Sequence, residues 1–117
     1  MTAARREALL RALYQAFNDR DIDTVLAAMT PDVDWPNGWE GGRVVGHAEV
    51  RSYWERQWAQ IRPSVRVRAF REHPDGTTEV RVRLVVRDPS GAVLDRSDVS
   101  HVYEFAGDLI RSMDVRR

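Results

Sequence analysis

The first apolar residues of the chain recur at the spacing of one helical face. They are Leu9, Leu10, Leu13, Tyr14 and Phe17. Mostly polar residues occupy the other faces, so this pattern predicts an amphipathic helix over residues 3–18. A shorter apolar run consists of Ile22, Val25, Leu26 and Met29. It predicts a second helix, with Asp21 or Asp23 as its N-cap and Pro31 as its stop.

A short strand and a loop are predicted next. Val33 and Trp35 alternate with aspartates, which is the spacing of a strand. The glycine and proline density of residues 36–42 is typical of a loop. Helical spacing then returns between residues 47 and 61, and Pro63 ends this third helix. Its apolar positions are Val50, Tyr53, Trp54, Trp58 and Ile61.

Alternation with period two dominates the rest of the chain. Four alternating runs are separated by turn signals at residues 73–76, 88–91 and 106–108. They predict an antiparallel meander of three long strands and a shorter one. The chain is therefore predicted to be a single α+β domain, residues 1–117, in which three N-terminal helices pack on a curved antiparallel sheet.

Composition disfavours several classes of function. The 18 basic and 18 acidic residues cancel, so no net field attracts nucleic acid or an anionic membrane. The absence of cysteine excludes disulfides, thiolate nucleophiles and cysteine-based metal sites. Charges interrupt the N-terminus where a signal peptide needs an apolar stretch, and no apolar run approaches the roughly 20 residues of a membrane span. We expect a cytoplasmic protein that binds neither nucleic acid nor membranes.

Two runs of sequence resemble the ends of a known type of domain. The first extends from Tyr14 to Trp35 and contains Pro-Asp-Val-Asp-Trp, and the second extends from His101 to Val115 and begins His-Val-Tyr-Glu-Phe. In order and spacing they resemble the SnoaL-like branch of the nuclear transport factor 2-like superfamily, which has the ketosteroid isomerase-like fold. The resemblance implies a cone-shaped fold, a small-molecule pocket and a homodimer formed through the outer sheet face. Such folds host isomerases, cyclases, epoxide hydrolases, dehydratases and non-catalytic binders, so fold alone does not define the reaction.

The ketosteroid isomerases among these relatives use a tyrosine, a general-base aspartate and a protonated aspartate. By resemblance, these positions fall on Leu13, Trp35 and His101. All three residue types are replaced, although Tyr14 and Asp34 lie one residue from the first two. Asp34 should point away from the pocket if Trp35 points inward, because side chains alternate along a strand. Chemistry like that of limonene epoxide hydrolase, which needs an Asp-Arg-Asp set in the pocket, is disfavoured because most arginines of the sheet have outward parity.

His101 is the sharpest catalytic candidate. It shares the inward parity of Val99, Tyr103 and Phe105, which places an imidazole on an otherwise apolar concave surface. With an ordinary pKa of about 6.5 it can serve as general acid, general base or hydrogen-bond donor to an oxyanion, and burial favours its neutral form. The alternative is a core histidine bonded to a neighbouring group. An Asp98–His101 dyad is disfavoured because the two residues have opposite parity.

Aromatic side chains supply candidate ligand contacts. Those predicted to bind a flat or cyclic ligand are Tyr14, Trp35, Trp39, Trp54, Trp58 and Tyr103. Trp39 lies in the glycine-rich loop, which can fold over the pocket as a lid, and Glu40 beside it offers a carboxylate at the rim. Two alternatives stay open: Trp54 and Trp58 belong to the core between helix and sheet, and Glu40 is a solvated loop charge.

No metal site or cofactor is predicted. His47, His73 and His101 lack metal-site spacing, and the glycines of residues 38–42 do not follow a phosphate-loop pattern. The sequence therefore predicts a small-molecule pocket protein, a lyase or isomerase that uses general acid–base chemistry on a cyclic, largely apolar compound. The alternative is a non-catalytic ligand-binding or dimeric assembly module, and the sequence leaves open whether the protein is an enzyme.

Overall fold

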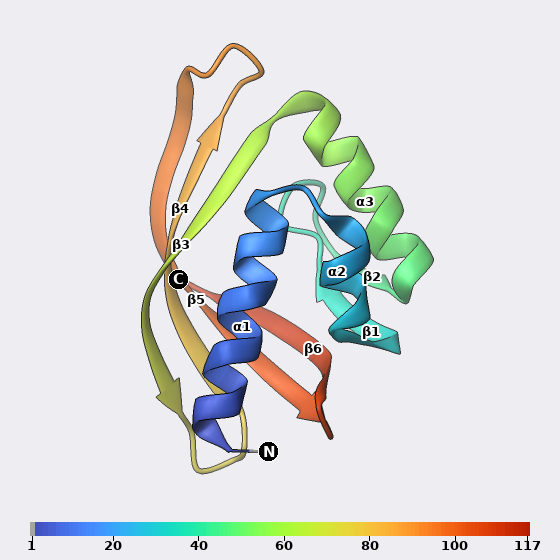
Figure 1. The fold of residues 1–117 in the computed structure, drawn as a ribbon. Helices are drawn as coiled ribbons and strands as arrows, with labels where there is room; N and C mark the ends of the chain where they lie inside the picture. Colours follow the sequence, from blue (N-terminus) through green and yellow to red (C-terminus); the bar gives the residue numbers. More distant parts are fainter. Residues whose placement is uncertain (1) are drawn as a thin grey trace.

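Helices and strands alternate along the first half of the chain, and strands alone make up the second half (Figure 1). The computed structural model describes residues 2–117. The helices are α1 (Ala3–Asn18), α2 (Ile22–Ala27) and α3 (His47–Gln60). The strands are β1 (Met29–Pro36), β2 (Arg43–Val45), β3 (Arg62–Glu72), β4 (Thr78–Arg87), β5 (Val93–Ala106) and β6 (Leu109–Arg116). The helices cover the concave side of the sheet, which confirms the predicted α+β architecture.

The sheet is mixed, so the prediction of an antiparallel sheet was wrong for one pair of strands. The strand order is β2-β1-β6-β5-β4-β3, and β1 runs parallel to β6, with Met29 opposite Ile110. The other neighbours are antiparallel. α3 and the long strands separate β1 from β6 in sequence, and a long connection of this kind allows two neighbouring strands to run in the same direction.

The three helices do not all precede the sheet, which corrects a second detail of the prediction. β1 and β2 come before α3. Met29, predicted to end the second helix, begins β1 instead, because the helix ends at Ala27, with Ala28 as its C-cap, and Pro31 cannot supply a helical N–H. β2 contains one buried apolar residue, Val44, and is too short to give an alternating signal.

Polar side chains cap the first two helices. The Thr2 hydroxyl accepts a hydrogen bond from the Arg5 backbone N–H at 3.1 Å, at the start of α1. The carboxylate of Asp21, rather than that of Asp23, caps α2 by accepting from the Thr24 backbone N–H at 3.3 Å. Hydrogen bonds from Thr24 hold the pKa of Asp21 below its ordinary value. Each cap satisfies a backbone donor that the helix itself leaves free.

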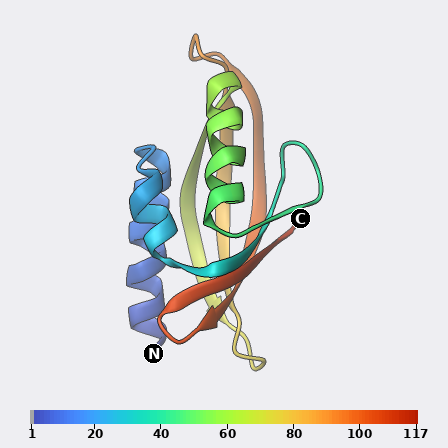
Figure 2. The same cartoon turned by 90° about the vertical axis from the view of Figure 1, so that its right-hand side faces the viewer.

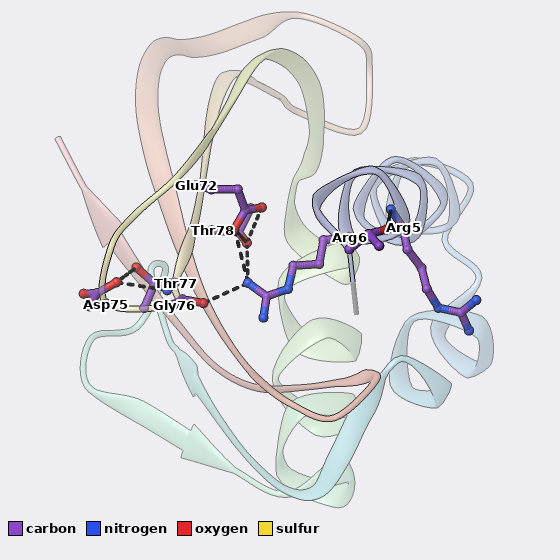
Figure 3. A network of polar contacts seen from close by, with 8 residues as sticks. Arg5, Arg6, Glu72, Asp75, Gly76, Thr77 and Thr78 are labelled. Atoms are coloured by element: carbon purple, nitrogen blue, oxygen red, sulfur yellow. Dashed lines mark hydrogen bonds and ion pairs between the residues drawn. The ribbon is translucent and has the colours of Figure 1, made fainter.

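A polar network fixes the start of α1 to the β3–β4 hairpin (Figure 3). The Arg6 guanidinium donates to the Gly76 carbonyl at 2.8 Å and to the Glu72 carboxylate at 3.2 Å. Thr78, which is fully buried, donates its hydroxyl proton to Glu72 at 2.9 Å. The same guanidinium lies over the Phe105 ring, 4.8 Å from its centroid. The network therefore holds α1 against the concave side of the sheet.

Irregular register bends the long strands around the helices. The pairing of β3 with β4 shifts between Val67 and Ala69, and that of β5 with β6 shifts between Glu104 and Phe105. Such bulges increase the local twist and bend a strand. Figure 2 is turned by 90° from the view of Figure 1 and shows α3 running along the concave side of the long strands. The bent sheet and its helices enclose the space described next.

Candidate active site

A cavity of about 350 Å³ lies between the helices and the concave face of the sheet. This volume falls in the range of roughly 300 to 1,000 Å³ that is usual for small-molecule sites. Its lining is mainly apolar and comes from α1, α3, β1 and the long strands. Polar side chains in the lining are Tyr14, Tyr53, Gln57, Asp95, Ser97, His101, Tyr103 and Arg117. A cavity of this composition suits a largely apolar compound with a few polar groups.

Two tyrosines and a histidine form one hydrogen-bonded chain in the cavity wall. Tyr103 donates its hydroxyl proton to the Tyr14 hydroxyl oxygen at 2.7 Å. Tyr14 Oη lies 2.8 Å from His101 Nδ1. Because Tyr14 accepts from Tyr103, its own proton is directed to Nδ1, which leaves the imidazole proton on Nε2. We call Tyr103, Tyr14 and His101 the tyrosine–histidine chain.

Burial fixes the protonation state of this chain. It lowers the pKa of His101 from its ordinary value to about 4. It also raises the pKa values of Tyr14 and Tyr103, and for Tyr14 the charge and the hydrogen bond of Tyr103 add to this rise. At neutral pH the imidazole is therefore uncharged and both hydroxyls are protonated. Within residues 2–117, Nε2 of His101 has no hydrogen-bond partner, so its N–H is free to bind a ligand.

Trp35 and Trp54 form an aromatic wall beside the tyrosine–histidine chain. Their ring centroids are 5.8 Å apart, with an edge-to-face angle of 82°. The Trp35 ring also lies 6.2 Å from that of Tyr103. Both tryptophans are buried and line the cavity, so Trp54, whose role the sequence left open, belongs to both the core and the cavity wall.

Trp58 does not contribute to the cavity lining. Its ring stacks on Trp54 at 5.7 Å with an interplanar angle of 8°, and the Arg20 guanidinium lies 5.1 Å from it. Trp58, which was predicted to contact the ligand, therefore lies outside the cavity lining and supports the aromatic wall by packing against Trp54.

Trp39 and Glu40 lie on one loop but face different surroundings. Trp39 lines the cavity while 39% of it stays exposed. Glu40 is not part of the lining and binds Arg56 on α3, with Oε1–Nη2 and Oε2–Nε distances of 2.8 and 3.1 Å. Hydrogen bonds from Arg56 and then from Asn37 lower the pKa of Glu40 to about 2. Glu40 therefore holds the loop against α3.

Asp34 and Asp98, which the sequence analysis weighed as possible catalytic groups, lie outside the cavity. Asp34 points away from it and accepts a hydrogen bond from Arg43 at 2.7 Å, while Trp35 points inward. Asp98 accepts from Arg83 at 2.7 Å on the opposite face from His101. Both observations agree with the parity expected along the strands.

Sequence reasoning missed several polar residues of the lining. Asp95 and Ser97 precede His101 on β5 with the same inward parity, so the period-two pattern could have identified them if it had been extended backward. Gln57 follows Tyr53 by one helical turn on α3 and shares its face. Gln57 was overlooked because only apolar positions were assigned to the inner face of that helix.

The remaining histidines have local partners. His47 begins α3, and its Nε2 lies 3.1 Å from the Met29 carbonyl oxygen. His73 Nε2 lies 2.7 Å from a Glu79 carboxylate oxygen. Across the described part of the chain, no three or more metal-ligating side chains cluster as a metal site requires. Over the same residues, none of the helices has the length and apolar character needed to span a membrane.

Comparison with known proteins identifies the family. The sequence profile of the SnoaL-like domain matches residues 10–113, and the chain belongs to this family. No curated protein matches the chain.

Solved structures share the fold over nearly the whole chain. TerC, crystallised with polyporic acid, is 25% identical, with a TM-score of 0.81 over 95% of this chain and 89% of its own. A nuclear transport factor 2-like protein of unknown function from Burkholderia pseudomallei is 24% identical, with a TM-score of 0.83 over 99% and 91%. A proposed polyketide cyclase from Xanthomonas campestris is 23% identical, with a TM-score of 0.76 over 96% and 89%.

Proposed function

We propose that this protein is an isomerase- or cyclase-type enzyme that acts on a cyclic, largely apolar carbonyl compound. The observation that carries the proposal is the tyrosine–histidine chain, which presents a neutral imidazole N–H to an apolar cavity. The SnoaL-like family and its similarity to a proposed polyketide cyclase support a reaction of this type. The co-crystal of TerC with polyporic acid supports a cyclic ligand.

His101 acts in this proposal as an electrostatic catalyst. When a proton leaves the carbon next to a carbonyl, negative charge develops on the carbonyl oxygen. The Nε2–H of His101 donates a hydrogen bond to that oxygen, and the bond strengthens as the charge grows. A neutral imidazole suits this role because its tautomer is fixed by Tyr14 and no proton has to be gained first. Removing one such donor typically costs about 100- to 1,000-fold in rate.

The cavity supplies no carboxylate close to His101. Asp95 is the one aspartate or glutamate of residues 2–117 in the lining, and it lies six residues before His101 on the same strand. At strand spacing this separation is about 20 Å, too far for both groups to act on neighbouring atoms. The proton acceptor is therefore a water molecule or a basic group of the substrate itself.

This lack of a nearby base favours a second candidate function, in which the cavity binds a small molecule without converting it. The two candidates differ in one measurable property. An enzyme of the proposed type exchanges the protons next to a ketone with solvent deuterium, whereas a binding protein leaves them in place.

Deuterium exchange into cyclic ketones, followed by proton NMR, tests the proposal. The wild type is compared with His101→Phe, which removes the N–H donor, and with His101→Gln, which keeps an amide donor. We expect wild-type exchange above the buffer rate, a loss of about 100-fold or more in His101→Phe, and a smaller loss in His101→Gln. Equal exchange by the wild type and His101→Phe would remove His101 from catalysis. Binding with only the buffer rate of exchange would establish the second candidate.

We also propose a cytoplasmic homodimer that associates through the outer face of the sheet. That face carries paired charges such as Arg83 and Asp98, and Leu94, at a register shift near the start of the same strand, is exposed. Sedimentation equilibrium of the wild type should give twice the chain mass, and Leu94→Asp should shift the equilibrium toward the monomer. A monomeric wild type at micromolar concentration would contradict the dimer.

A further inference from the structure

A second polar pair lies in the cavity wall, on α3. Gln57 and Tyr53 are both buried, with 9% and 4% of their surfaces exposed, and both line the cavity. Gln57 Nε2 donates to the Tyr53 hydroxyl oxygen at 3.1 Å. The other polar atom of the amide, Oε1, is buried and has no hydrogen-bond partner among the described residues.

An unpartnered carbonyl at this position is unfavourable for the free protein. A buried acceptor that has lost its water costs stability unless a donor replaces that water. Leucine has a similar length and would pack beside the apolar Trp54 on this helix without the cost. Gln57 is thus better explained by a donor that arrives with a ligand than by packing.

We propose that Gln57 determines specificity by accepting a hydrogen bond from a hydroxyl group of the ligand. This inference rests on the proposed function, in which a ligand carbonyl faces His101, and it narrows the ligand class to cyclic hydroxyketones. The two polar contacts come from different walls of one cavity, since His101 lies on β5 and Gln57 on α3. An apolar ring with a carbonyl and a hydroxyl is then held in one orientation.

Gln57 can reach such a hydroxyl with little change in structure. The last side-chain torsion of glutamine has a broad energy minimum, so the amide can turn its Oε1 toward the cavity. The same rotation moves Nε2, so the hydrogen bond from Gln57 to the Tyr53 hydroxyl is exchanged for the bond to the ligand. Gly38 and Trp39 line the same cavity as Tyr53 and Gln57, which places this polar pair and the loop in one site.

Pairs of hydroxyl compounds and their methyl ethers distinguish a hydrogen bond donated to Gln57 from simple contact with the ligand. The probes are hydroxytetralones with the hydroxyl at each ring position, the corresponding methoxytetralones, and unsubstituted tetralone; estrone and its methyl ether form a larger pair. A methyl ether keeps the oxygen but has no proton to donate. Isothermal titration calorimetry should show at least one hydroxyl compound binding the wild type about tenfold or more tightly than its ether.

Three variants test whether Gln57 causes the preference for the hydroxyl compound over its ether. Gln57→Leu should reduce the ratio of ether to hydroxyl dissociation constants to about one. Gln60→Leu, the same change at an exposed position of α3, should leave the ratio at its wild-type value. His101→Phe should weaken the hydroxyl compound and its ether equally, which tests the proposed function separately from this inference.

Several results would overturn the inference. The first is a ratio of ether to hydroxyl dissociation constants of one in the wild type. The second is an unchanged ratio in Gln57→Leu, and the third is no binding by any probe. A ligand-free measurement adds a further check, because Gln57→Leu should melt at or above the wild-type temperature once the unpartnered carbonyl is gone. A clear fall in the melting temperature would show that Gln57 is needed for folding and would also overturn the inference.

Discussion

Tyr14 and His101 are separated by 87 positions in sequence, yet the tyrosine hydroxyl lies 2.8 Å from Nδ1 of the imidazole. The first helix therefore sets the tautomer of a residue on the fifth strand. The rings are nearly stacked, with centroids 5.9 Å apart and an interplanar angle of 27°. A side chain of α1 thus determines which imidazole nitrogen carries the proton that a ligand meets.

Substitution of the two tyrosines should separate tautomer control from packing. Tyr14→Phe removes the donor to Nδ1, so the imidazole should populate both neutral tautomers and deuterium exchange should fall. Tyr103→Phe removes the bond that directs the Tyr14 proton to Nδ1 but keeps the Tyr14 donor, so the tautomer preference should weaken less than in Tyr14→Phe. Each change should cost about 0.5 to 1.5 kcal/mol of stability, the usual net value of a hydrogen bond. Nitrogen-15 NMR of the histidine ring measures the tautomer, and an unchanged ring spectrum in Tyr14→Phe would refute the assignment.

The stability of the protein should depend on pH through His101. Its pKa is about 4 in the folded protein and about 6.5 in an unfolded chain, so the unfolded state binds more protons between these values. Stability should therefore be full above pH 6.5 and fall as the pH drops toward 4, by on the order of 3 kcal/mol at most. Urea denaturation of the wild type and His101→Gln across this window measures the effect. Parallel curves for the two proteins would exclude His101 as its source.

Release of Glu40 should loosen the loop over the cavity without unfolding the domain. Arg56→Ala removes the two hydrogen bonds that Arg56 donates to the Glu40 carboxylate and leaves the one from Asn37. Hydrogen–deuterium exchange of residues 38–42 should then become several-fold faster, while the melting temperature changes little because the pair is exposed. Arg51→Ala, which breaks an exposed pair with Asp23 on α2, is the control and should leave this loop unaffected. Unchanged loop exchange in Arg56→Ala would mean that other contacts fix the loop.

The buried hydroxyl of Thr78 should be important for stability. Thr78→Val keeps the shape of the side chain but removes the donor to Glu72 and the acceptor for Arg6. We expect a loss of about 0.5 to 1.5 kcal/mol, the usual net value of a hydrogen bond, because Arg6 and Glu72 still bond each other after the hydroxyl is removed. Thr77→Val, at a less buried position in the adjacent turn, should cost less. Urea midpoints of the two variants provide the comparison, and equal midpoints would contradict the role of the network.

The sequence predicted the elements whose side chains repeat over a long stretch. α1 extends over the predicted residues 3–18, and the inward parity of Val99, His101 and Tyr103 is confirmed by their place in the cavity wall. Helical and strand periods are local properties, so each can be recognised without knowledge of the partner element.

Contacts between distant elements were not predictable in the same way. The bond between Tyr14 and His101 depends on how α1 crosses the sheet, and no local period encodes that crossing. The parallel pairing of β1 with β6 has the same origin. Gln57 was missed because a polar residue on an inner face contradicts the rule by which such faces are recognised, and such exceptions are expected at functional sites.

The position of β6 also bears on how this chain folds during synthesis. The last strand lies between β1 and β5, so β1 and its neighbour β2 stay detached from the long strands until β6 has left the ribosome. Until then the helices of the first half have an incomplete surface to cover, and the edges of β1 and β5 that β6 will occupy remain open to other chains. Folding of this domain is thus expected to finish only after β6 has been translated, and dependence on chaperones should be greatest for a chain that stops just before residue 109.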